Sequence, residues 1–260
     1  MKTTTALMAT VLLTSTVLVG CGASPTAPEQ PTRQQVPVRG LQPADGWTAQ
    51  PGATAPGQAA PAGAADAQAQ QPLAGVRKAQ AANRGFSATV QTWEKGAGKT
   101  ESGTLKIAFK KPSVMRLEIQ KSTNSQAQGV KLRWEGGSEF KIKPTWMPFA
   151  VGVGITDKRV ISLNGWTIKE TDVTCILNVL LDPATQVKFI GPQTFDGLNL
   201  VAVEARSPKS PKGVTHEVVG IDPQSGLPKA RMLYKGQELV YKLTVKSMAL
   251  KVPGESELSM

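Results

Sequence analysis

Few side chains in this sequence are suited to covalent or metal chemistry. The 260 residues include one histidine, His216, and two cysteines, Cys21 and Cys175. A Ser-His-Asp or Cys-His site would depend on His216, and a His/Cys zinc site would lack ligands. His216 and Glu217 are neighbours in an alternating run, so their side chains point to opposite faces of a strand and form no dyad. We therefore expect no enzyme activity, no metal and no cofactor.

Other polar or small residues have structural interpretations. Cys175 lies in an apolar helical pattern and is interpreted as a core residue. Glu170 and Asp172 come near the start of that helix, where acidic side chains are stabilised. Gly152-Val153-Gly154 is interpreted as a glycine-containing turn, without the strand–loop–helix setting of a phosphate site.

Cys21 has a more specific context. A positive start at Met1-Lys2 precedes a mostly apolar run from Ala6 to Val19, too short to cross a bilayer but suited to a signal peptide. The run ends in Leu18-Val19-Gly20-Cys21, which resembles the bacterial lipobox. That resemblance implies cleavage after residue 20 and acylation of Cys21, for example with palmitate. The alternative is an ordinary secretory signal in which Cys21 is incidental.

The lipobox resemblance also implies a location. Gly22 stands where an Asp would retain an enterobacterial lipoprotein in the inner membrane. We therefore expect export and anchoring in the outer membrane facing the periplasm, or on the outer face of the cell membrane if the organism has no outer membrane. A lipidated Cys21 would leave Cys175 without a disulfide partner.

Composition divides the rest of the chain in two. Residues 21–72, the lipidated Cys and a Pro/Ala/Gln-rich stretch with nine of the 19 prolines, are predicted to be a disordered tether. Positive and negative charges cancel up to Pro72, so the net charge of +11 falls on the predicted domain, residues 73–260. This positive charge is suited to binding an anionic lipid surface. An equally open interpretation is that the basic side chains only solvate the outer faces of the strands. Nucleic acid is a poor partner for an exported protein, and a monomer is expected.

Beyond residue 72, hydrophobic residues alternate with polar ones in short runs that turn residues separate. This period of two predicts antiparallel strands with one apolar face. The predicted strands are centred on residues 86–90, 105–110, 115–119, 130–134, 140–143, 159–163, 186–190, 198–205, 214–221, 230–234 and 239–252. Helical spacing predicts two short helices, over 73–83 and 173–181, the latter with Asp172 as its N-cap. The fold class is therefore mainly β, a curved antiparallel sheet or unclosed barrel of about ten or eleven strands with one or two short helices as a lid.

Two such helices look too small to cover the apolar face, which favours a hydrophobic cavity for an acyl chain. A fully packed face is the open alternative. The candidate lid residues are Ile176, Leu177 and Leu180. The candidate cavity residues are Leu105, Ile107, Phe109, Met115, Leu117, Ile119, Leu132, Trp134, Phe140 and Ile142.

Several turn and strand motifs resemble the LolA/LolB-like lipoprotein carrier family. They are the run from Gly103 to Pro112 with Met115-Arg116-Leu117, Leu132 to Gly137, Gly220-Ile221-Asp222-Pro223 with Gly226-Leu227-Pro228, and the closing strand from Tyr241 to Val252. The resemblance covers most of residues 81–252. It implies an unclosed barrel with a helical lid, and lipoprotein transport in the cell envelope with other lipoproteins or a carrier as partners.

The same resemblance gives the loop from Pro144 to Val151 a role. Trp146, Met147 and Phe149 are candidates for a hydrophobic loop that touches the membrane, and a buried loop that plugs the barrel is the alternative. We expect a membrane-anchored lipoprotein that binds acyl chains or lipids. The alternatives are an envelope sensor or regulatory protein-binding module on the same fold, and a structural surface lipoprotein with a filled core.

Overall fold

The computed structural model describes residues 65–260. The predicted signal peptide, the lipidation of Cys21 and most of the predicted tether lie outside the described residues. Within residues 65–260, no helix combines the length and the hydropathy needed to cross a bilayer.

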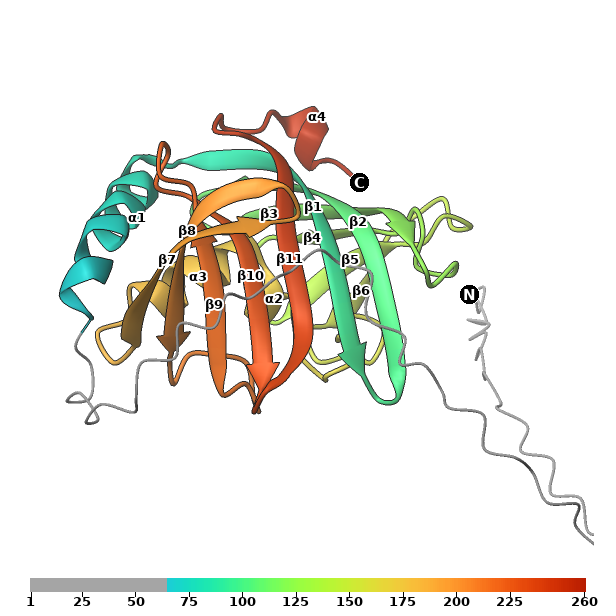
Figure 1. Cartoon of the computed structure of the whole chain (residues 1–260). Coiled ribbons are helices and arrows are strands. Elements are labelled where there is room, and N and C mark those ends of the chain that lie inside the picture. The colour runs from blue at the N-terminus through green and yellow to red at the C-terminus, as the bar shows by residue number, and fades with distance from the viewer. Residues whose placement is uncertain (1–64) are drawn as a thin grey trace, which may run out of the picture. The chain divides into compact units, whose positions relative to one another are not determined.

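Eleven strands form the main part of the regular structure in the described chain (Figure 1). The strands are β1 (Gly85–Gly96), β2 (Lys99–Lys110), β3 (Val114–Ser122), β4 (Lys131–Trp134), β5 (Glu139–Lys143), β6 (Val151–Gly154), β7 (Gln186–Phe195), β8 (Leu198–Arg206), β9 (His216–Ile221), β10 (Pro228–Lys235) and β11 (Glu238–Ala249). The helices are α1 (Gln70–Ala82), α2 (Ile168–Thr171), α3 (Val173–Leu180) and α4 (Glu255–Leu258), with a 3-10 turn over Ala67–Ala69.

All eleven strands belong to one antiparallel sheet in the order β6-β5-β4-β3-β2-β1-β11-β10-β9-β8-β7. Strands adjacent in sequence are therefore adjacent in the sheet, and β1 pairs with β11 to join the two halves of the chain. The sheet ends at β6 and β7 and does not close into a barrel. The chain between these two edge strands carries α2 and α3 across the concave face. The fold class predicted from alternation is confirmed.

The concave face holds two hydrophobic clusters. One gathers side chains of β1–β6, β10 and β11 together with residues 155–173. The other gathers α1 and α3 over β7, β8 and β9. Each strand contributes apolar residues to these clusters because alternate side chains share a face, as the pattern predicted. A third cluster, of Phe195, Leu200, Ala202, Ala230 and Met232, lies on the other face of the sheet.

Both predicted helices are present. α3 begins after Asp172, whose carboxylate accepts a hydrogen bond from the backbone N–H of Cys175 at 2.7 Å, so the predicted N-cap is confirmed. α1 begins at Gln70, three residues before the start predicted from the apolar spacing. Asp66 accepts a hydrogen bond from the N–H of Gln68 and starts a helical turn, and Ala69 is fully buried. The small side chain of Ala69 is enough to pack in this core. Because the residues around it are mostly polar, the apolar spacing did not indicate that the helix starts before Leu73.

One predicted strand is wrong. Residues 159–163 form turns, because the Asp157 carboxylate binds both the backbone N–H and the guanidinium of Arg159 at 2.7–2.9 Å. The strand at this edge of the sheet is instead β6, which the sequence assigned to a glycine-containing turn. Val151 and Val153 of β6 pair with Ile142 and Phe140 of β5, and the two glycines of β6, Gly152 and Gly154, are exposed.

Candidate functional site

The ten predicted cavity residues lie together on the concave face of β2–β5. Six of them are buried: Ile107, Met115, Leu117, Leu132, Phe140 and Ile142. The other four, Leu105, Phe109, Ile119 and Trp134, are partly buried against the same cluster. The structure therefore brings the ten side chains together, in close-packed contact with other apolar side chains.

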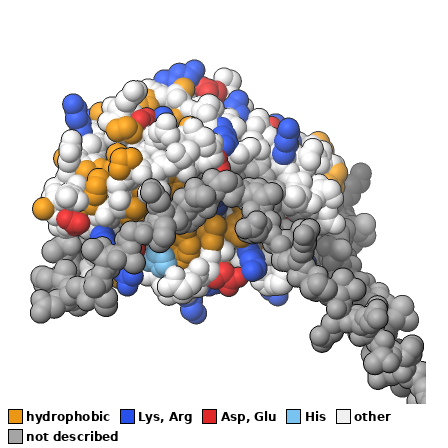
Figure 2. Space-filling view, in the orientation of Figure 1, with side chains coloured by type: hydrophobic (Ala, Val, Ile, Leu, Met, Phe, Trp, Pro, Cys, Tyr) orange, Lys and Arg blue, Asp and Glu red, His pale blue; other side chains and the backbone are white. Residues whose placement is uncertain are grey.

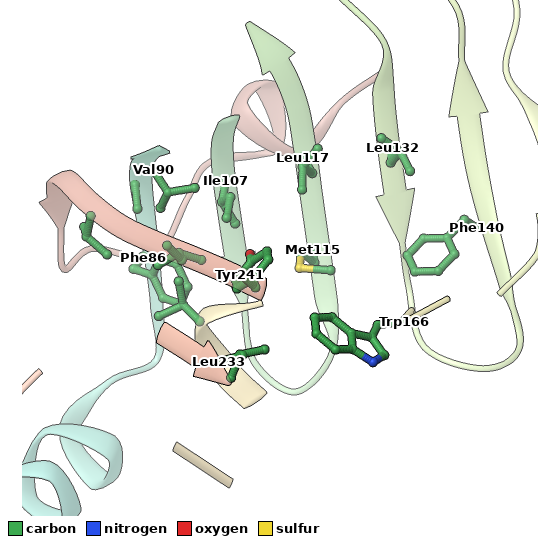
Figure 3. Close-up of a cluster of buried hydrophobic side chains, with 14 of the residues drawn as sticks. Phe86, Val90, Ile107, Met115, Leu117, Leu132, Phe140, Trp166, Leu233 and Tyr241 are labelled. Carbon is green, nitrogen blue, oxygen red and sulfur yellow. The ribbon is translucent and has the colours of Figure 1, made fainter. Parts of the chain in front are cut away.

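Trp166 is buried in this cluster (Figure 3), and no pattern in the sequence had indicated it. Its indole is 1% exposed, its Nε1 donates to the Lys212 carbonyl at 2.9 Å, and its ring meets Tyr241 edge-on with centroids 6.3 Å apart. Trp166 belongs to the stretch between β6 and α3, residues 155–172, which we call the covering segment. This segment lies over β1–β5 where the sequence predicted a lid of helix.

The three predicted lid residues cover the other half of the sheet. Ile176, Leu177 and Leu180 of α3 are buried against α1 and against the concave face of β7–β9. They share no cluster with the ten predicted cavity residues. The sheet is long enough for its two halves to have different covers, and spacing along the chain does not show which half a helix will reach.

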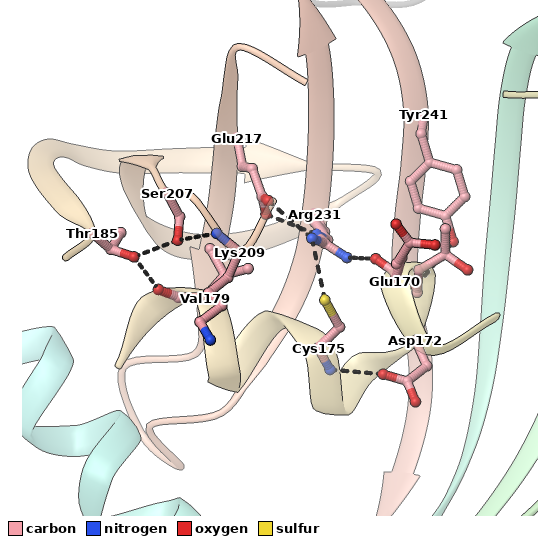
Figure 4. Close-up of polar contacts among 11 residues, drawn as sticks. Glu170, Asp172, Cys175, Val179, Thr185, Ser207, Lys209, Glu217, Arg231 and Tyr241 are labelled. Carbon is pink, nitrogen blue, oxygen red and sulfur yellow. Dashed lines mark hydrogen bonds and ion pairs between the residues drawn. The ribbon is translucent and has the colours of Figure 1, made fainter. Parts of the chain in front are cut away.

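A fully buried ion pair lies beneath α3 (Figure 4). The Arg231 guanidinium binds both carboxylate oxygens of Glu217, at 2.8 and 2.9 Å, and donates to the Glu170 carbonyl at 2.8 Å. Both side chains are 0% exposed. Burial opposes the charge of Arg231, but the Glu217 carboxylate outweighs it and raises the pKa of the guanidinium. The bidentate geometry satisfies both ions and indicates a structural role.

The neighbours of this pair are also shielded from water. Burial raises the pKa of Asp172 to about 6, against hydrogen bonds from Cys175 and Thr174 that lower it. Burial likewise raises the pKa of the Cys175 thiol and of the Tyr241 hydroxyl. A thiol in this state is a poor nucleophile, in keeping with the interpretation of Cys175 as a core residue.

The histidine has no part in this cluster. Glu217 points into the concave face, whereas the His216 ring stacks on Tyr234 with centroids 4.6 Å apart and is half-buried. The predicted separation of His216 and Glu217 is confirmed. The sequence missed Arg231 as the partner of Glu217, because the two residues meet only through pairing of β9 with β10.

An open groove with an apolar lining lies beside α1. Its volume is about 880 Å³, and its walls are α1, the turn between β9 and β10, and the chain after β11. Phe189, Val201 and Ile221 form an apolar part of it that continues into the cluster under α1 and α3. Leu250 and Val252, which are 56% and 49% exposed, form its outer edge. Figure 2 shows hydrophobic side chains at the surface on the α1 side of the molecule.

The rim of this groove is basic. Lys78, Arg84 and Lys251 are among its lining residues, and the acidic Asp222 is already bound to Lys229 at 2.7 Å. A lipid with an anionic head group has matching chemistry, because its chain can contact the apolar wall while its head meets the basic rim.

Two glycines bring α1 close to the opposite wall. Gly226 has a φ of +69°, and a Cβ at this position would lie 2.5 Å from the carbonyl oxygen of Gly75. Any other residue at 226 would push α1 away from the turn between β9 and β10. The close approach holds the groove at a defined width.

The loop between β5 and β6 is exposed. Trp146 and Phe149 are 77% and 60% exposed, and Met147 is half-buried. The alternative that this loop plugs the barrel is therefore wrong. Its prolines and the short β5–β6 pairing carry the loop away from the core, which the covering segment already fills.

Comparison with known proteins gives likeness of fold at low sequence identity. No family model matches the chain, and no curated protein matches it.

Similar solved structures include an uncharacterized conserved protein from Thermus thermophilus, with 14% identity over 74% of this chain and 92% of that chain and a TM-score of 0.45. A putative outer membrane lipoprotein-sorting protein domain from Vibrio parahaemolyticus has 12% identity over 73% and 97% of the two chains, with a TM-score of 0.40. A LolA superfamily protein from Nitrosomonas europaea has 9% identity over 74% and 97%, with a TM-score of 0.36. Solved structures similar to this chain thus include members of the family that its turn motifs resemble.

Proposed function

We propose that this protein is a non-enzymatic envelope lipoprotein, anchored through Cys21, that binds acyl chains or lipids and takes part in lipoprotein or lipid transport or insertion. The observation that carries the proposal is the groove beside α1, with its apolar wall and basic rim. Its volume of about 880 Å³ lies within the range of roughly 300–1,000 Å³ that is typical of ligand pockets.

In this proposal the acyl chain first lies against Phe189, Val201 and Leu250, and the anionic head meets Lys78 and Lys251. Transfer needs no covalent step, because the chain moves between the groove and a bilayer according to its affinity for each. For a lipid to reach the ten predicted cavity residues on the concave face, the covering segment with Trp166 would have to move away from the sheet.

The loop with Trp146, Met147 and Phe149 supplies the membrane contact in this proposal. Indole rings favour the interface between lipid and water. Lys131 and Lys143 face each other on β4 and β5 just before the loop, which adds attraction to an anionic surface.

The test uses the chain from Gly22 onward, produced in a bacterium without its leader, with native mass spectrometry followed by lipid extraction. We expect a bound lipid that Leu250→Asp or Val252→Asp removes, because a charge on the apolar wall opposes the chain. The matched control is Ile190→Asp, since Ile190 is 41% exposed but lies outside the groove. Exposed positions are chosen because a charge at buried Leu117 or Ile142 would unfold the domain.

Two results would contradict the proposal. One is an empty protein that also takes up no added fluorescent fatty acid. The other is equal loss of lipid from Leu250→Asp and Ile190→Asp. An empty protein would favour the alternative of an envelope sensor or regulatory protein-binding module. A pull-down under envelope stress tests that alternative directly.

A further inference from the structure

A second groove lies on the convex face, on the side of the sheet away from the two clusters of the concave face. Its volume is about 850 Å³. Its floor is formed by β11, β1, β2 and β3, where outward-facing residues stand in register. Lys242, Trp93 and Ser102 form one row across the strands, and Thr244, Gln91, Thr104 and Lys121 form the next.

The tip of the β7–β8 hairpin forms one wall of this groove. The hairpin bends over the outer face so that Asp196 at its tip reaches β11, where its carboxylate binds Lys242 Nζ at 3.0 Å and Thr244 Oγ1 at 2.7 Å. Figure 1 shows this hairpin (orange) crossing in front of β9 and β10. Buried Phe195 and Leu200 hold it there.

That wall depends on a glycine in the strand beneath it. A Cβ on Gly220 of β9 would lie 2.6 Å from Leu200 Cδ1 and 3.0 Å from the Phe195 ring. The absence of a side chain on Gly220 therefore lets the hairpin tip pack on the sheet. The opposite side of the groove is formed by Ser122, Thr123 and Gln128, so the concave shape on this otherwise convex face is well defined.

A β-bulge supplies one of the basic groups. In the pairing of β1 with β11, Thr89 is opposite Ser247 and Val90 is opposite Val245, so Lys246 is the extra residue. Bulges redirect a side chain and are over-represented next to active sites. Lys246 lines the groove together with Lys121, and neither forms an ion pair with another of residues 65–260.

Trp93 is the large aromatic residue of this lining, among hydroxyl, amide and lysine side chains. It is half-buried on the wet face of the sheet, and it takes part in none of the aromatic pairs of residues 65–260. A sugar ring can stack its C–H face on an indole, while its hydroxyl groups form hydrogen bonds with the surrounding polar side chains. Trp93 and its polar neighbours therefore match the chemistry of a sugar.

The backbone of the floor argues against a peptide as ligand. β1, β2, β3 and β11 lie in the middle of the sheet, so each pairs with a strand on both sides. An extended peptide therefore finds no free strand edge here. We propose that this groove binds an anionic saccharide, with Trp93 as the stacking surface and with Lys121 and Lys246 as partners of its acidic groups.

This site is separate from the lipid groove and goes beyond the proposed function. A saccharide held on the convex face would position a tethered lipid-binding protein on an acidic glycan of the cell envelope. Loss of one activity does not require loss of the other, so the two proposals can fail independently.

The experiment measures binding of a short oligogalacturonate by titration calorimetry, with the chain from Gly22 onward in about 0.15 M salt. We expect Trp93→Ala to weaken the affinity about tenfold or more, and Trp93→Phe, which keeps an aromatic face, to weaken it by no more than about threefold. Lys121→Gln and Lys246→Gln each reduce affinity about fivefold. Lys188→Gln, an exposed lysine on β7 outside the groove, leaves it unchanged.

Folding is checked by urea unfolding of every variant, and Leu250→Asp is expected to bind the oligosaccharide as the wild type does. Absence of binding by a folded wild-type protein would overturn the proposal. So would an equal effect of Lys188→Gln and Lys121→Gln with none from Trp93→Ala, because that pattern describes unspecific attraction by a basic protein. Equal affinity for a neutral N-acetylglucosamine oligomer would overturn the assignment of an anionic ligand.

Discussion

The two halves of the concave face are covered in different ways. Over β7–β9 the cover is regular structure: α1 and α3 pack their apolar sides on the sheet, and the buried Arg231–Glu217 pair ties the sheet to the end of α2. Over β1–β5 the cover is the covering segment, which is mostly irregular and holds its place through Trp166.

This difference has a physical consequence. A helix satisfies its own backbone hydrogen bonds, whereas an irregular segment depends on separate side-chain and turn contacts. We therefore expect the half under α1 and α3 to be the more stable, and the half under the covering segment to open first. Substitutions in each half test this contrast.

The largest effect is expected in the helix-covered half. Arg231→Met leaves the Glu217 carboxylate buried without its partner, so it should lower the free energy of unfolding by about 3–5 kcal/mol. Urea unfolding followed by circular dichroism measures this value. The double variant Arg231→Met/Glu217→Leu removes both charges and should regain much of the loss. A loss below about 1 kcal/mol in the single variant would contradict a structural role for the pair.

Trp166→Ala tests the other half. Removal of the indole leaves a cavity and an unpaired Lys212 carbonyl, and we expect a loss of about 3 kcal/mol in the free energy of unfolding. Hydrogen exchange should show faster exchange in residues 155–172 while α1 and α3 stay protected. Equal loss of protection in both halves would show that the two covers unfold as one unit.

Asp172, at the junction of the covering segment with α3, gives a pH-dependent test. Its pKa of about 6 in the folded state exceeds the usual value near 3.9, so the folded protein holds a proton that the unfolded chain releases. Stability from this residue is therefore highest below about pH 4 and falls as pH rises to about 6, by about 2–3 kcal/mol. Asp172→Asn should remove this fall between pH 4 and pH 7. Parallel stability curves for the variant and the wild type would contradict the prediction.

The smallest effect on stability is expected from the exposed loop. Trp146→Ser/Phe149→Ser should change the free energy of unfolding by no more than about 0.5 kcal/mol, because these side chains already face solvent. The same double variant should lose binding to vesicles of phosphatidylglycerol and phosphatidylethanolamine in a flotation assay. The control is Ile190→Ser, which changes an exposed apolar residue outside the loop. Flotation of the double variant equal to that of this control would show that the loop does not contact the membrane.

Local patterns in the sequence were enough to predict much of the architecture. Period-two alternation located ten of the eleven strands, and helical spacing with Asp172 as N-cap located α3. These features are visible in sequence because neighbouring residues decide them: alternate side chains of a strand share a face, and a cap bonds within three residues. Strand β6 was missed because its two valines alternate with glycines, and the pattern of residues 159–163 matched a strand more closely.

The candidate functional surfaces depended on contacts between distant parts of the chain. Pairing and bending of the sheet bring distant side chains into contact: Trp166 with Tyr241, Arg231 with Glu217, and Asp196 with Lys242. No spacing in the sequence predicts these contacts. Both grooves likewise form where separate elements approach, at Gly75 with Gly226 and at Gly220 with Leu200. The sequence by itself determined ten of the eleven strands, α1, α3 and the alternation of apolar side chains. The tertiary structure alone decided which segment covers each half and where the surface is hollow, because both depend on the curvature of the whole sheet.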